Sequence, residues 1–291
     1  NKELHYFSRK PSIIPESNGF GGTAGETQFV GPNASQAAKI IYYLKKRHTI
    51  GKMTLEIQDK DGNLVTELTA GKSKGINVIE WNYTTKAPKT AVGKTFVFGG
   101  FTSPRAAAGT YKVVIQKGKD TYTTDLVIQY PPSSSVTVAD RELQQKTTRQ
   151  LFAMTEDLAY LVYELDELLA TCDKLKSKNP AAAKSNATFE NGLLKLKETL
   201  LITTGDNYVG AGNPQLREDL SELYGKVAGS FFGPSAAELE NMKALESRFA
   251  KAKETFLGLK SKHGKSFESL LVKNGIEPVT LKPFAEFVKL P

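Results

Sequence analysis

The chain has 291 residues, 24% of them charged, and carries a formal net charge of +8 at pH 7. That length favours two compact units, and no apolar run reaches the roughly 18 residues of a membrane-spanning helix. A single cysteine, Cys172, excludes an internal disulfide and a multi-cysteine zinc site. Residues 1–134 hold 18 Lys and Arg against 10 Asp and Glu, whereas residues 135–291 hold 21 of each. The first half therefore carries the whole basic excess and would attract an anionic partner.

Residues 1–34 are predicted to form an extended lead-in segment that contains glycine and proline. The stretch SNGFGGTAGETQFVGPN, residues 17–33, holds five glycines and includes the loose pattern Gly19-x-Gly21-x-x-Ala24. A phosphate-binding loop with this pattern needs a strand before its first glycine and a helix after its last. Neither flank has that form, so we interpret the stretch as a connector and predict no cofactor.

Residues 35–132 alternate apolar and polar residues as strands do. The strand-like runs lie at 39–44, 53–58, 64–69, 76–83, 109–116 and 121–130, separated by turn sequences such as DKDGN and KGKD. Short strands with period two and hairpin turns are typical of an antiparallel sheet with one buried face. This range is therefore predicted to be an antiparallel Ig-like β-sandwich, with Trp81 buried in it.

Residues 133–291 follow a helical period that begins after the breaker YPPSSS. Apolar residues spaced three and four apart form one long seam: Leu151, Met154, Leu158, Leu161, Leu165, Leu168, Cys172 and Leu175. Three further amphipathic segments come after it. The pattern predicts an up-and-down antiparallel four-helix bundle with a short C-terminal helix and tail.

Helix ends are predicted from capping chemistry. Ser235 and Glu238 have the spacing of a capping box, and Asn213 before Pro214 has the form of an N-cap followed by a first-turn proline. Gly229 and Gly264 are predicted to end helices.

The candidate binding patch is the densest group of cations in the first half. It consists of Lys39, Lys45, Lys46, Arg47 and Lys52. An anionic glycan or an envelope protein would be attracted by it, although solvated lysines on a sheet face are also common. No nucleic-acid recognition motif accompanies the charge, so a nucleic-acid partner is not predicted.

Catalytic and metal-binding patterns find little support. DKDGN, residues 59–63, begins like a calcium loop, but loop position 12 would be Ala70 and strands flank it, so Asp61-Gly62 is better interpreted as a hairpin turn. The histidines His5, His48 and His263 accompany no nucleophile motif, and Cys172 occupies a core position. We predict no catalytic, cofactor-binding or metal-binding residue, and therefore a non-enzymatic chain.

Several stretches together resemble a known family. They are GPNASQAAKIIYYLKKRHTIGKMTLEIQDKDGNLVTEL, GINVIEWNY and TSPRAAAGTYKVVIQKGKDTYTTDLVIQY, then LREDLSELYGKVAGSFFGPSAAELENMKALESRF and LLVKNGIEP. They are similar to the C-terminal region that follows the β-propeller in secreted bacterial proteins with BNR or sortilin-like repeats, which are often labelled glycosyl hydrolases. The resemblance implies export to the periplasm or cell surface and an upstream propeller as partner. It transfers no catalytic residue, because any active centre would lie on propeller blades and this chain has none.

The sequence leaves three hypotheses for function. The first is a non-enzymatic accessory region that acts as a spacer or protein-docking unit of an exported propeller protein. The second is a part of a glycan-active hydrolase whose catalytic site lies upstream in the propeller. The third is a module that binds an anionic glycan or an envelope partner through the basic sandwich.

Overall fold

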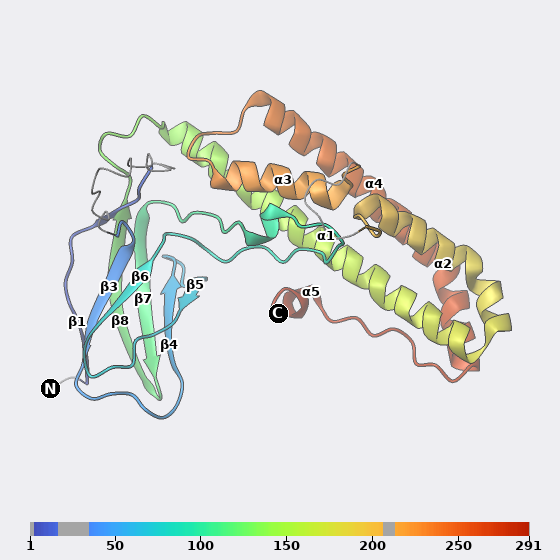
Figure 1. Cartoon of the computed structure of the whole chain (residues 1–291), viewed down its shortest axis with the longest axis horizontal. Coiled ribbons are helices and arrows are strands. Elements are labelled where there is room, and N and C mark those ends of the chain that lie inside the picture. The colour runs from blue at the N-terminus through green and yellow to red at the C-terminus, as the bar shows by residue number, and fades with distance from the viewer. Residues whose placement is uncertain (1–2, 17–34, 206–212, 291) are drawn as a thin grey trace, which may run out of the picture. The chain divides into compact units, whose positions relative to one another are not determined.

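The chain forms two compact units in the computed structural model, which describes residues 3–16, 35–205 and 213–290. The β unit comprises Asn1–Lys86 and Ser103–Val138. The helical unit comprises Ala87–Thr102 and Ala139–Pro291. The order of strands first and helices second is confirmed (Figure 1).

The β unit holds eight described strands in two sheets. The first sheet has the order β1 (Leu4–Tyr6), β3 (Ala38–Leu44) and β6 (Gly75–Trp81), all antiparallel. The second has the order β2 (Ser12–Ile13), β8 (Asp120–Gln129), β7 (Gly109–Lys117), β4 (Met53–Gln58) and β5 (Leu64–Leu68). The six strands of residues 38–129 lie within two residues of the predicted runs, because each has its own period-two pattern.

The prediction of an antiparallel Ig-like sandwich is wrong. The five-stranded sheet is mixed, because β2 pairs in parallel with β8, with Ser12 opposite Ile128. The chain pairs with β3 in the first sheet through β1 and then crosses to the edge of the second sheet as β2. Strands of two and three residues are too short to show an alternating pattern, so the sequence of residues 3–16 did not indicate that this segment adds a strand to each sheet. Both sheets curl around one shared core.

The core of the β unit is centred on large side chains from both sheets. Trp81 is 1% exposed, and its ring centroid lies 5.8 Å from that of Tyr83 and 5.3 Å from that of Tyr111. Its indole Nε1 donates a hydrogen bond of 2.8 Å to the Thr84 carbonyl, so the one polar atom of the side chain is satisfied. The prediction of a buried tryptophan is confirmed.

The described part of the helical unit contains two long α-helices and three shorter ones, besides the short 3-10 helix Phe98–Phe101. They are α1 (Val138–Lys178), α2 (Pro180–Leu200), α3 (Leu216–Gly229), α4 (Ala236–Lys273) and α5 (Phe284–Phe287). The predicted seam of α1 is buried from Leu151 to Leu175 except at Leu168, which is partly buried. The heptad spacing therefore identified the core-facing side of α1 correctly.

The prediction of an up-and-down bundle is wrong, because α1 and α4 run parallel. Lys253 pairs with Asp157 at 3.2 Å and Lys260 with Glu164 at 3.4 Å, so each step of seven residues along one helix is matched along the other. Figure 1 shows α2 and α3 as two separate helices that lie beside the long helices α1 and α4.

Between α1 and α4 the chain runs back antiparallel to α1, first as α2 and then as α3. Lys197 of α2 pairs with Asp166 in the second half of α1, whereas Gln144 in the first half donates to the Val227 carbonyl of α3 at 2.8 Å. At 1.5 Å per residue α1 is about 60 Å long, and α2 and α3 are about 30 Å and 20 Å. Each is too short to match α1 alone, so together they form one broken antiparallel rod.

Residues 87–102, which we call the strap, leave the strand region between β6 and β7 and pack on α3. The buried Arg217 donates through Nε to the Ala91 carbonyl at 2.7 Å and through Nη1 to Thr95 Oγ1 at 3.1 Å. The Gly99 amide donates to Ser221 Oγ at 2.8 Å, and a Cβ on Gly99 would lie 2.3 Å from that atom. The strap therefore belongs to the helical unit, although its residues fall within the range assigned to the sandwich.

The C-terminal tail lies against α1. Tyr160 donates to the Lys282 carbonyl at 2.9 Å, and the Phe287 ring of α5 stacks on Tyr163 with centroids 5.0 Å apart.

The predicted helix ends are partly correct. The capping box of Ser235 and Glu238 is present, and α3 ends at Gly229. The N-cap of α3 is Gln215 rather than Asn213, and α4 continues through Gly264 to Lys273, because glycine costs a helix interior only about 1 kcal/mol.

Candidate functional site

Four of the five predicted patch residues lie together in the connection between β3 and β4, residues 45–52. Lys45, Lys46 and Arg47 directly follow β3, Lys52 directly precedes β4, and all four are exposed. Lys39 does not join them. It lies on β3 about 20 Å from Lys45 along the strand, partly buried and 3.9 Å from Glu80.

Two further connections bring more cations to the same end of the β unit. The His48 amide donates to the Lys72 carbonyl at 2.9 Å, which joins the β3–β4 connection to the one between β5 and β6. Lys117 lies opposite Met53 in the β4–β7 ladder, which brings the β7–β8 turn to Lys52. Sequence reasoning missed these residues because they are distant in the chain. The signal that could have identified them is that each of the three turns between predicted strands contains lysines.

We call this surface the basic end. It consists of Lys45, Lys46, Arg47, Lys52, Lys72, Lys74, Lys117 and Lys119. Within the described parts of the chain none of the eight has an ion-pair partner within 4 Å, and the acidic residues of these strand ends are Glu3 and Asp120. Unpaired cations at this density raise the local concentration of anions. The arrangement can hold several negative charges at once.

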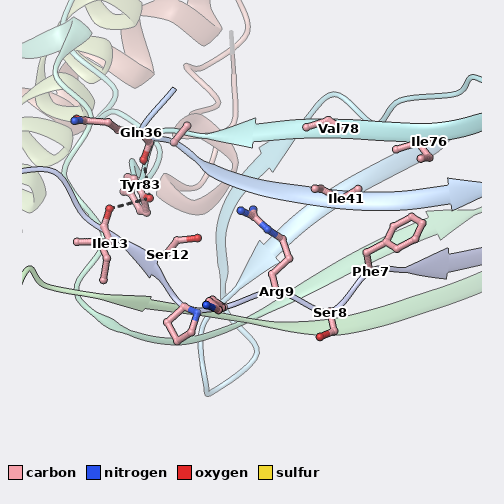
Figure 2. Close-up of a pocket in the computed structure, with 13 residues that line it drawn as sticks. Phe7, Ser8, Arg9, Ser12, Ile13, Gln36, Ile41, Ile76, Val78 and Tyr83 are labelled. Carbon is pink, nitrogen blue, oxygen red and sulfur yellow. Dashed lines mark hydrogen bonds between the residues drawn. The ribbon is translucent and has the colours of Figure 1, made fainter. Parts of the chain in front are cut away.

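A groove of about 740 Å³ lies on the outer face of the first sheet (Figure 2). Its apolar lining includes Phe7, Ile41, Ile76 and Val78, and Arg9 and Lys10 line it from the segment between β1 and β2. The described residues that line the groove include no His, Asp or Glu, the side chains that act most often as general bases.

One end of the groove is formed by Tyr83, a buried residue with φ of 59°. Its hydroxyl donates to the Gln36 carbonyl at 2.8 Å and lies 3.2 Å from the Ile13 carbonyl (Figure 2). Burial raises the pKa of this hydroxyl above its usual value, so it remains a neutral donor at neutral pH.

The turn at residues 59–63 uses its carboxylate internally. Asp59 Oδ1 accepts from the amides of Asp61 at 2.9 Å and Asn63 at 2.8 Å, and Oδ2 accepts from the Asn63 side chain at 3.0 Å. The Asn63 side-chain hydrogen bond is the main cause of a lowered pKa for Asp59. Gly62 has φ of +84°, which agrees with the hairpin-turn interpretation. Over the described ranges no three His, Cys, Asp or Glu residues form a metal-binding cluster.

The histidines and the cysteine contact different residues. The His5 ring contacts Phe7 on the β unit, the His263 ring contacts Phe189 in the helical unit, and His48 is in the β3–β4 connection. Cys172 is 1% exposed in the helical core, 3.4 Å from Asn186 Nδ2. No hydrogen bond joins a histidine to Cys172 within the described residues.

Cys172 is expected to resist alkylation in the native protein. Burial raises its thiol pKa to about 12, so almost no thiolate forms even at pH 9, and the sulfur is covered. Iodoacetamide labelling followed by mass spectrometry should leave Cys172 unmodified at pH 8–9 and modify it fully in urea. Rapid labelling without denaturant would contradict the buried placement. Because the folded pKa is the higher one, ionisation of the unfolded chain also lowers stability above about pH 9.

Comparison with family models and with curated proteins identified no relative of this chain. No family model matches the chain, and no curated protein is significantly similar to it. The resemblance to propeller-associated regions therefore stays a prediction, as does export. No helix of residues 3–16, 35–205 and 213–290 is long and apolar enough to cross a membrane. The glycine-rich stretch at 17–33 lies outside the described residues.

Proposed function

We propose that this chain is a non-enzymatic binding region of an exported protein, and that its basic end holds an anionic polysaccharide. The observation that carries the proposal is the convergence of eight cations from three strand connections with no carboxylate paired to any of them in the described chain. A linear polyanion presents its charges in a row, and loops held side by side by backbone contacts can contact several of them together.

The helical unit supports a spacer role in the same protein. Its α1 helix of 41 residues is about 60 Å long and is buttressed along its length by α2, α3 and α4. A rod of this kind can hold the parts of a larger protein at its two ends apart. The expectation that a propeller lies upstream belongs to this proposal and rests on the resemblance of sequence phrases.

The basic end is tested by replacing Lys45, Lys46 and Arg47 together with glutamine. Binding of the full chain to a fluorescent heparin-type polysaccharide, measured by anisotropy, is expected to weaken by about tenfold or more at 0.05–0.1 M salt. The replaced side chains are exposed, so the fold should be unaffected. Wild-type binding should weaken steeply as salt rises, and the variant should depend less on salt.

The matched control replaces three exposed lysines of α4, Lys243, Lys262 and Lys265, with glutamine. This variant has the same net charge change, so it measures the effect of overall charge alone and should bind nearly as the wild type does. Equal binding by both triple variants would contradict the proposal. Equally tight binding of wild type to double-stranded DNA and to the polysaccharide would remove the assignment to glycan.

A further inference from the structure

Strand β6 is a free edge of the first sheet. It pairs with β3 along its whole length, and β3 pairs on its other side with β1. Along the described chain no other strand pairs with residues Gly75–Trp81. An exposed strand edge is a template for another strand unless the protein blocks it.

The backbone groups that face this free edge can be identified from the register. The Phe7 amide donates to the Ile41 carbonyl and the Lys45 amide to the Glu3 carbonyl, so odd-numbered residues of β3 face β1 and even-numbered ones face β6. Because β3 pairs Tyr42 with Asn77, odd-numbered residues of β6 face β3. The amides and carbonyls of Ile76, Val78 and Glu80 therefore point outward from the sheet.

Two of these three edge residues have exposed apolar side chains, and the third is Glu80. Ile76 is 64% exposed and Val78 is 50% exposed, on the face opposite the core residues Asn77 and Trp81. Figure 2 shows both on the outer strand, next to Ile41 of β3. Edge strands that remain unpaired usually carry a proline or lysine at such positions, and β6 has neither between Gly75 and Trp81.

The charges at the two ends of β6 are opposite. Lys74 lies immediately before the strand, in a turn fixed by the Asn77 side chain, whose Nδ2 donates to the Ser73 carbonyl at 2.8 Å and to the Gly75 carbonyl at 3.2 Å. Glu80 lies near the other end and has one weak intrachain partner, Lys39 at 3.9 Å. A strand that is basic at its start and acidic at its end is complementary to itself in the antiparallel direction.

We infer that β6 pairs antiparallel with β6 of a second copy of this chain. In the register centred on Asn77, Ile76 lies opposite Val78 of the second copy, and Lys74 lies opposite Glu80 of the second copy. Two-fold symmetry makes each of these pairs occur twice. Ile76 and Val78 both direct their backbone groups outward, so the opposed residues exchange amide–carbonyl hydrogen bonds. The two three-stranded sheets become one sheet of six strands.

The charge pattern distinguishes this partner from an unrelated strand. A parallel copy would place Lys74 against Lys74 and Glu80 against Glu80, which is unfavourable. In the antiparallel copy a single register places apolar side chains opposite apolar ones and acidic side chains opposite basic ones. This register therefore determines both the direction and the alignment of the second strand. Lys74 belongs both to the basic end and to this edge, whereas the apolar residues Ile76 and Val78 belong to the edge alone.

A charge exchange tests the pairing on the full chain without polysaccharide. Sedimentation velocity over a concentration series should show a reversible dimer for the wild type. Glu80→Lys or Lys74→Glu alone places like charges opposite each other twice and should raise the dimer Kd by about tenfold or more. The double variant K74E/E80K restores both pairs, and its Kd should return to near the wild-type value.

A second variant tests the edge at one of its apolar positions. Val78→Lys changes an exposed side chain and should abolish the dimer without lowering the melting temperature, because lysine at a strand edge blocks pairing. A wild-type chain that stays monomeric at every concentration would overturn the inference. So would a dimer that Val78→Lys leaves intact, or a double variant that stays as weak as the single ones.

Discussion

Replacing Arg217 with alanine is expected to lower the free energy of unfolding of the helical unit by about 3–5 kcal/mol. Arg217 is 7% exposed and pairs with Glu218 at 2.7 Å, with both side chains largely buried. Its guanidinium also donates to Thr95 Oγ1 and to the carbonyls of Ala91 and Thr95. The variant leaves a buried carboxylate without its cation and several strap acceptors without donors, and each unsatisfied group carries its full desolvation cost.

Urea titration monitored by circular dichroism at 222 nm measures this loss, because the α-helices lie in the helical unit. Fluorescence of Trp81, the only tryptophan, reports on the β unit in the same samples and should shift less. Arg248→Ala is the matched control. Arg248 forms a more exposed ion pair with Asp219 and should cost less than about 1 kcal/mol. Equal losses for the two variants would mean that the strap is not held by Arg217.

Elements with their own repeating pattern were predictable from the sequence. The strands from β3 to β8 and the buried seam of α1 follow from periods of two and of three to four residues, which depend only on local spacing. The capping box at Ser235 is also local. The antiparallel pairs β4–β5 and β7–β8 were also predictable, because a hairpin turn joins each pair. The other strand pairings and the helix directions were not predictable in this way, because they depend on contacts between residues distant in the sequence.

The strap shows this limit most clearly. Its residues Thr95 and Gly99 lie between two strands in the sequence, yet their partners Arg217 and Ser221 are more than a hundred residues away. Arg217 is a charged residue next to the apolar Leu216, and no local pattern distinguishes it from a solvated arginine. Its burial depends on the strap carbonyls of Ala91 and Thr95, which accept its hydrogen bonds.

The candidate site was predictable to the extent that its cations are adjacent in the chain. Lys45, Lys46 and Arg47 are consecutive, so their proximity needed no structure. Lys72 and Lys117 join them through the backbone contact of His48 and the register of β4 with β7. Lys39 is only six positions from Lys45 in the sequence, which is why it was predicted to be part of the patch. Along an extended strand, however, six residues separate the two lysines by about 20 Å.

Replacing Trp81 with alanine is expected to lower the free energy of unfolding of the β unit by about 3–5 kcal/mol. Trp81 is the largest fully buried side chain and contacts the rings of Tyr83 and Tyr111. Its removal leaves a cavity between the two sheets. The shared core can close that cavity only by shifting strands whose backbone pairings are already fixed.

Trp81→Phe separates ring packing from the hydrogen bond. Phenylalanine keeps an aromatic ring against Tyr111 but cannot donate to the Thr84 carbonyl, so we expect a loss of about 1–2 kcal/mol. Because both variants lack the only tryptophan, hydrogen exchange with mass spectrometry should follow the amides of β4 and β7, whose core residues include Leu55 and Ile115. If the alanine and phenylalanine variants exchange equally fast, the Thr84 hydrogen bond rather than ring volume would be the dominant contribution. The two sheets would then depend on a single polar contact, and the apolar core would contribute less than its burial implies.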